Sequence, residues 1–230
     1  MKLLTNKQSD YLLILLVAAD LGFIALGIIY ECGFIDLIDA CRAFNFDDYY
    51  SLTRDRGYAE LFQYLKEYWL VILFLFLAIN QNIKTYLGWS FLFSYILVDD
   101  ALEIHENLGL AISEKLNFIY AFNLRPRDYG ELIFFAVVGA FFFAWLSISY
   151  RLSNKKERKI TRHLIGILLG LATFGIFADV IHIMFEQYPF WKSTIGIIED
   201  GGEHIVMSLF VCYVMSLTTN SSRFRNKTIY

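Results

Sequence analysis

Three short windows of this sequence combine carboxylates with histidines inside otherwise apolar stretches. They are VDDALEIHE at 98–106, FADVIHIMFE at 177–186 and IEDGGEHI at 198–205. Together they hold nine carboxylates and three histidines, and none of them contains a lysine or an arginine. Ionisable residues in apolar segments are costly to bury and commonly mark sites of chemistry or ion passage. These windows are therefore the first candidates for a functional site.

Helical spacing places most ionisable residues of each window on one face. At about 100° per residue, residues three, four and seven positions apart lie close together on a helix. His105 points away from the face of its window, so we expect it to contribute least. The three predicted faces hold, window by window, Asp99, Asp100, Glu103 and Glu106; then Asp179, His182 and Glu186; then Glu199, Asp200, Glu203 and His204.

The chemistry expected of these faces is metal binding. Carboxylates crowded in a pocket of low dielectric must take up protons, pair with cations or bind a metal ion. Oxygen-rich clusters with imidazole suit zinc, manganese or iron, as a site for one or two ions. The expected cofactor is therefore a divalent ion, and its candidate ligands are Asp99, Asp100, Glu103, Asp179, His182, Glu199, Glu203 and His204.

A bound metal ion predicts an enzyme. A metal-bound water would attack an ester, amide or phosphoester of a lipid, with Glu203 or Glu103 as the general base. A redox reaction at two ions is a variant of the same hypothesis. The competing structural interpretation is that outer arginines such as Arg125 and Arg127 neutralise part of the cluster, while other acids lie in water.

Two further hypotheses need no enzyme. The acidic cluster would serve a cation or proton channel or transporter if Asp20, Glu106 and Glu186 formed an ion path. Alternatively, the chain is a sensor or anchor subunit that binds a cytoplasmic protein or anionic lipid through the basic segment 151–163 and the C-terminal tail. We find no nucleotide-binding glycine loop and expect no specific binding of nucleic acid.

The windows FADVIH and EDGGEHI distantly resemble the membrane-embedded zinc hydrolases related to alkaline ceramidases. The resemblance implies a zinc ion held by three histidines and an aspartate, with a serine beside it, in a fold of seven membrane helices. The chain departs from this pattern. It has no HxxxH pair in its last apolar segment, it carries many more carboxylates, and it is predicted to have six spans.

The elements that carry these windows are predicted to be transmembrane helices. Of the 230 residues, 57% are hydrophobic, 18% are aromatic and only 19% are charged, with a mean hydropathy of +0.47. A span needs about 20 apolar residues, so six spans fill half the chain and leave no room for a second domain. The sequence predicts one all-α membrane bundle, 1–230, with spans at 11–30, 68–86, 88–106, 131–150, 164–186 and 195–217.

Basic residues determine the predicted orientation. The run RLSNKKERKITRH at 151–163 is short and basic, so it is expected on the cytoplasmic side, together with both termini. All three windows then fall in the outer halves of their helices, in a bacterial inner membrane or a plasma membrane. The protein is expected to contact membrane lipids, and the GxxxG spacing of Gly166 and Gly170 would allow a homo-oligomer.

Several smaller features belong to the outer side. The segments 34–46 and 58–69 are amphipathic and are predicted to be short helices on the outer surface. Cys32 and Cys41 fall in the first outer loop, where a disulfide is possible, whereas Cys212 is expected to pack inside a span. Gly201-Gly202 interrupts the last span and predicts either local unwinding or close helix packing.

Overall fold

The computed structural model describes residues 7–34, 47–81 and 83–227, and side chains up to residue 219. In these ranges the chain is helical and forms no β-strand, which confirms the all-α class. The elements are α1 (Lys7–Phe34), η2 (Asp48–Tyr50), α2 (Tyr58–Gln81), α3 (Lys84–Leu102), α4 (Ile104–Leu116), α5 (Pro126–Leu152), α6 (Lys155–Ala172), η3 (Thr173–Ala178, a π-helix), α7 (Asp179–Met184) and α8 (Pro189–Lys227).

Five helices of the described chain are long and apolar enough to cross a membrane. They are Lys7–Cys32, Tyr58–Gln81, Pro126–Leu152, Lys155–Met184 and Pro189–Thr219, with mean hydropathies of 1.3 to 2.7. In Lys155–Met184, the elements α6, η3 and α7 follow one another without a break. The predicted third span corresponds to α3, which is not among the five and carries Asp99 and Asp100 in its last turn.

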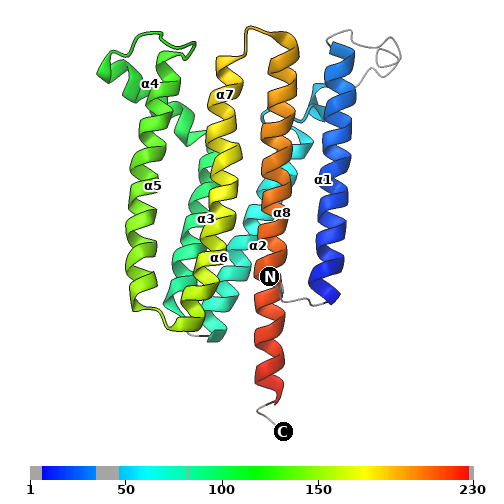
Figure 1. The fold of residues 1–230 in the computed structure, drawn as a ribbon, viewed down its shortest axis with the longest axis vertical. Helices are drawn as coiled ribbons and strands as arrows, with labels where there is room; N and C mark the ends of the chain where they lie inside the picture. The colour runs from blue at the N-terminus through cyan, green and yellow to red at the C-terminus, as the bar shows by residue number, and fades with distance from the viewer. Residues whose placement is uncertain (1–6, 35–46, 82, 228–230) are drawn as a thin grey trace.

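The long helices lie side by side and alternate in direction (Figure 1). One end of the bundle holds the start of α1, the α2–α3 junction, the α5–α6 turn and the end of α8 (Figure 1). We call it the basic end, because the segment 151–163 lies there. The opposite end, which holds α4, η2 and the α7–α8 turn, we call the acidic end (Figure 1).

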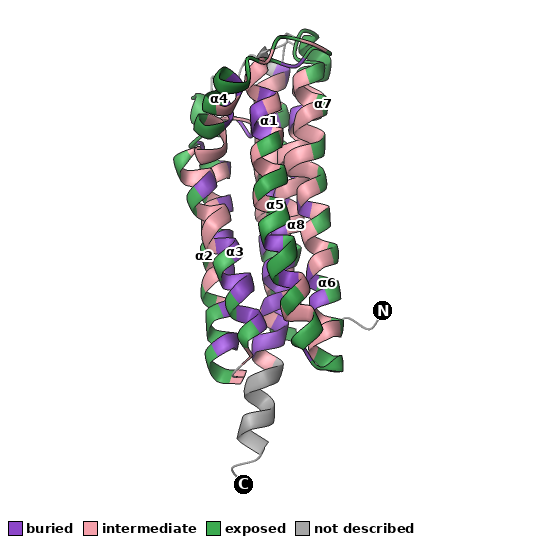
Figure 2. Ribbon diagram, turned by 90° about the vertical axis from the view of Figure 1, so that its left-hand side faces the viewer, coloured by how far each residue is buried: buried purple, intermediate pink, exposed green. Residues whose placement is uncertain are grey.

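The apolar core lies toward the basic end, around α2, α3 and α8 (Figure 2). Phe74, Trp89, Phe93 and Phe210 are fully buried. Phe74 stacks on Trp89 and on Phe93 at 5.8 Å, and Phe93 meets Phe210 edge-on at 4.8 Å between centroids. Such aromatic pairs contribute packing energy beyond their buried area. The aromatic core therefore fills the space between α2, α3 and α8 in the basic half of the bundle.

Several helix ends differ from the predicted spans. α2 begins at Tyr58 instead of 68 and so includes the predicted surface helix 58–69. α3 ends at Leu102 instead of 106, because Glu103 adopts a left-handed conformation (φ 52°) and the chain turns into α4. α6 begins at Lys155, inside the predicted basic loop, where the Asn154 side chain accepts hydrogen bonds from the backbone amides of Lys156 and Glu157. This capping favours a helix start.

Two of the smaller predictions concern the segment after α1. The predicted surface helix 34–46 lies, apart from Phe34, outside the described residues. Cys32 is disulfide-bonded, and its predicted partner Cys41 also lies outside them. Cys212 is a free, buried cysteine in α8, as expected of a packing residue.

Candidate metal centre

A deep cavity of about 1530 Å³ runs into the bundle from the acidic end. All three windows predicted from the sequence line it, through α3, α4, α7 and α8, and residues of α1, α2, α5, α6 and η3 also contribute to its wall. The ionisable residues of its wall near the acidic end include Glu67, Asp99, Asp100, Glu103, His105, Glu106, Glu131, Asp179, His182, Glu186, Glu199, Asp200, Glu203 and His204. Segments up to 100 residues apart thus contribute to one polar chamber.

Three of these side chains form a compact group between α7 and α8. Asp179, His182 and Glu199 each offer a ligand atom, and these atoms lie within 4.8 Å of one another. The Nδ1 atom of His182 lies 2.8 Å from Oε2 of Glu199. Both side chains are partly buried, with exposed fractions of 21% and 12%. One imidazole and two carboxylates at this separation match the donor set of zinc, manganese or iron.

The π-helix η3 sets the position of this group. It ends at Ala178, directly before Asp179, and it packs against α8. Gly175 makes room for Glu203, since a Cβ at Gly175 would overlap with its Oε1 atom. A Cβ at Gly202 would overlap with the Phe174 ring. π-Bulges are frequent at functional sites, and here the irregular turn fits closely against the carboxylates of α8.

α8 remains helical through Gly201-Gly202. Of the two predicted alternatives, the structure therefore has close packing and not unwinding. Gly170 likewise packs inside the chain, because a Cβ there would contact Val206 of α8 at 3.6 Å. Small residues let the helices around the polar chamber approach closely.

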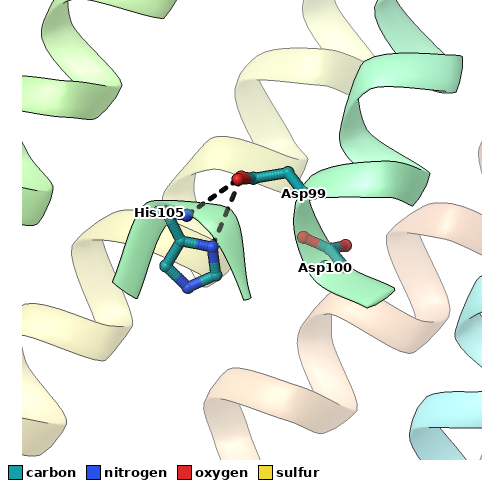
Figure 3. A group of neighbouring side chains, drawn as sticks. All are labelled: Asp99, Asp100 and His105. Carbon is teal, nitrogen blue, oxygen red and sulfur yellow. Dashed lines mark hydrogen bonds and ion pairs between the residues drawn. The ribbon is translucent and has the colours of Figure 1, made fainter. Parts of the chain in front are cut away.

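A second group lies where α3 meets α4 (Figure 3). Asp99, Asp100 and His105 also offer ligand atoms within 4.8 Å of one another. However, Asp99 is already engaged: its Oδ1 accepts the backbone N–H of His105 at 2.9 Å, and its Oδ2 lies 3.3 Å from His105 Nδ1 (Figure 3). Helix spacing alone had directed His105 away from this face, but the break at Glu103 turns it back toward Asp99.

The contacts of Asp99 support a structural role for this group. Burial lowers the pKa of His105, but the contact with Asp99 and the charges of Asp99 and Asp100 outweigh burial, so the pKa is raised above 6.5. Asp99 therefore favours the cationic form of the ring, while the same carboxylate caps the first turn of α4. Metal binding requires the neutral ring and so competes with this pairing.

His204, a predicted ligand, lies in a different network. Its Nδ1 atom is 3.0 Å from Lys66 Nζ, and its carbonyl oxygen accepts a hydrogen bond from the same ammonium at 2.9 Å. Lys66 also pairs with Asp20 at 3.0 Å, and Ser208 donates to the other oxygen of Asp20. The side chains of Lys66 and Asp20 are fully buried. Asp20, predicted as part of an ion path, is thus paired inside the bundle and is not among the residues that line the cavity.

Lys66 was missed as a central residue. The sequence analysis placed it in the amphipathic segment 58–69, before a span beginning at 68. The signal that could have pointed to it is Asp20, an acid in the middle of an apolar helix that needs a compensating partner. Spacing along the chain does not identify which lysine or arginine that partner is.

Three other predicted site residues lie at the rim, where basic side chains meet them. Glu103 pairs with Arg56 at 2.9 Å, and Glu106 pairs with Arg127 at 2.7 Å. Glu186 lies 3.4 Å from Lys192 and 4.0 Å from Arg125. The outer basic residues therefore neutralise the rim of the cavity, which was one of the interpretations left open by the sequence.

The carboxylates deeper in the cavity have no such partners. Among the ion pairs of the described residues, none joins Asp179, Asp200 or Glu203 to a lysine or an arginine. Glu67 is fully buried, and its carboxyl group interacts with that of Asp100, another acid of the same wall. Buried acceptors of this kind require a proton, water or an ion. The inner part of the chamber thus holds buried acidic groups that a proton or a bound cation would compensate.

Comparison with known proteins supplies the family but no activity. A family model described as Domain of unknown function (DUF8692) matches residues 11–217, so the chain belongs to this family. Searches of curated proteins and of solved structures gave no significant match.

Proposed function

We propose that this protein is a polytopic membrane protein of six helices that binds one divalent transition-metal ion at Asp179, His182 and Glu199 and uses it for hydrolysis. The observation that carries the proposal is the convergence of these three ligand atoms within 4.8 Å, on the wall of a cavity whose deeper carboxylates lack basic partners. α3 is counted as the sixth span because it packs along α2 over its length.

The donor set leaves open coordination positions. Three protein ligands are typical of catalytic zinc sites, in which the ion lowers the pKa of a bound water and polarises the substrate. Glu203 lies one helical turn after Glu199 and lines the same cavity, so it is our candidate for the general base. Gly175 supports this role, since a larger residue there would displace the Glu203 carboxylate.

We assign the metal to the α7–α8 group and not to the α3–α4 group. In the α3–α4 group, Asp99 already accepts the backbone N–H of His105 and pairs with its ring. A metal ion there would have to displace a helix cap and an ion pair. In the α7–α8 group, the hydrogen bond to be replaced, as far as the described residues show, is the one between His182 and Glu199.

The proposed orientation places the acidic end outside. Short basic segments stay in the cytoplasm, and the segment 151–163 lies at the basic end. The disulfide-bonded Cys32 is near the last turn of α1, at the acidic end. Disulfides persist in oxidising compartments, so this bond supports the same orientation.

Metal analysis of the detergent-purified protein tests the proposal. We expect stoichiometric zinc, manganese or iron in the wild type and its loss in His182→Ala and Asp179→Asn. His163→Ala is the matched control, because His163 is exposed on α6 and contacts Tyr213 outside the cavity. Equal metal content in wild type and His182→Ala, or no metal in the wild type after supplementation, would refute the metal site.

A further inference from the structure

The cavity does not stop at the carboxylates but continues toward the basic end as an apolar channel. Its walls there come from α5 and from the run of α6 and η3, and the cavity reaches Arg151 and Arg162. Residues that line this part include Phe135, Val138, Phe142, Leu146, Ile165 and Leu168. The metal-binding proposal uses none of them.

The length of the apolar part corresponds to one leaflet of a bilayer. From Phe135 to Leu146 on α5, the lining extends over about 17 Å at about 1.5 Å per residue. The hydrocarbon core of a membrane is about 30 Å thick, so a lipid chain of one leaflet occupies about 15 Å. The whole cavity, at about 1530 Å³, is also larger than the roughly 300–1,000 Å³ of sites for small molecules.

The channel is open sideways between α5 and α6. Phe143 and Leu169 both line the cavity, yet they are 75% and 63% exposed. In Figure 1, α5 forms one edge of the bundle, and the exposure of Phe143 and Leu169 places this opening at the surface of the described chain. For a chain that spans a membrane, those surroundings are lipid, and an acyl chain could enter without crossing water.

We propose that the channel holds one acyl chain of a membrane lipid, with the polar headgroup of that lipid beside Asp179, His182 and Glu199. This inference rests on the proposed function and names its substrate class. The opposite orientation would put the end of the chain among Asp200, Glu203 and their neighbours, where it would remove water without replacing any hydrogen bond. A headgroup at the acidic end instead supplies polar atoms where the wall is polar.

Two glycines provide a matched pair of variants. Gly139 on α5 lines the channel, and a Cβ there would meet no atom within 4 Å. Gly166 on α6 has the same open space but is not among the residues that line the cavity. Gly139→Phe should therefore fill the channel, whereas Gly166→Phe adds the same ring outside it. Both variants replace a helical glycine, so neither is expected to weaken its helix.

The probe is a phosphatidylcholine that carries a diazirine on the terminal carbon of one palmitoyl chain, in nanodiscs of unlabelled lipid. After photolysis, peptide mass spectrometry compares the labelling of residues 162–172 with that of α1, whose exposed surface reports non-specific contact with bulk lipid. We expect preferential labelling of 162–172 in the wild type and in Gly166→Phe. In Gly139→Phe it should fall to the level of α1.

Two results would overturn the inference. Equal labelling of 162–172 in Gly139→Phe and the wild type would mean that the label reports bulk lipid. Preferential labelling of residues 176–183 would mean that the chain lies in the opposite direction. Metal content is measured on the same samples. If metal is absent but the channel labelling depends on Gly139, the metal site fails while the lipid channel stands.

Discussion

Lys66→Met tests whether one buried ammonium holds three helices together. Lys66 on α2 contacts Asp20 on α1 at 3.0 Å, and on α8 it contacts both Nδ1 and the carbonyl oxygen of His204. Methionine keeps the length and the apolar stem of the side chain but removes the charge and all three contacts. Asp20 would then keep only Ser208 and His204 as neighbours.

The expected loss of stability follows from burial. Both partners are 0% exposed, so the carboxylate of Asp20 cannot regain water when the lysine is removed. Breaking one side of a buried ion pair costs about 3–5 kcal/mol. For a chain of this size, each kcal/mol lowers the melting temperature by about 2–4 °C, so we expect Lys66→Met to melt about 6–20 °C below the wild type.

Thermal unfolding in detergent, followed by circular dichroism, measures this difference. The double variant Lys66→Met/Asp20→Asn should recover part of the loss, because it no longer buries an unpaired charge. Lys84→Met is the control, since Lys84 is exposed at the start of α3. The reasoning is refuted if Lys66→Met has the same melting temperature as the wild type, or if the double variant has a lower melting temperature than Lys66→Met alone.

Two further predictions concern packing and pH. Gly202→Leu should destabilise the protein by about 1–3 kcal/mol, because the larger side chain would overpack against Phe174. Gly22→Leu is the control, since a Cβ at Gly22 meets open space. Thermal unfolding compares the two variants, and equal melting temperatures would contradict the close contact of η3 with α8. The raised pKa of His105 means that its pairing with Asp99 stabilises the protein fully below about pH 6.5 and is lost as pH rises through the raised value. The difference in melting temperature between wild type and His105→Gln should therefore shrink with rising pH, and a difference independent of pH would contradict the ion pair.

The sequence predicted those features that depend on local pattern. Apolar runs indicated long helices, and the helical period placed Asp179 and His182 on one face, where they line the cavity together. Glu199 faces them from α8, as expected if windows at equal depth share one site. Each of these expectations needs only composition and the spacing of neighbours along the chain.

The remaining features depend on partners distant in sequence. Lys66 stays helical and buried only because Asp20 and His204, 46 and 138 residues away, compensate its charge. His105 meets Asp99 only because Glu103 breaks the helix between them. A continuous helix through this point would direct the His105 side chain away from Asp99. The irregular turn of η3 follows from tertiary packing against α8, which no local pattern reveals.

The division of the bundle into a polar half and an apolar half also determines how the protein experiences membrane voltage. Moving one elementary charge across 100 mV changes its energy by about 2.3 kcal/mol, but only where water is excluded. In the proposed orientation, the chamber at Asp179 and Glu199 is connected with the outside. Most of the field then falls across the aromatic core around Phe74 and Trp89 and across the lipid-filled apolar channel beside it. Metal uptake from outside should then proceed equally in energised and de-energised membranes.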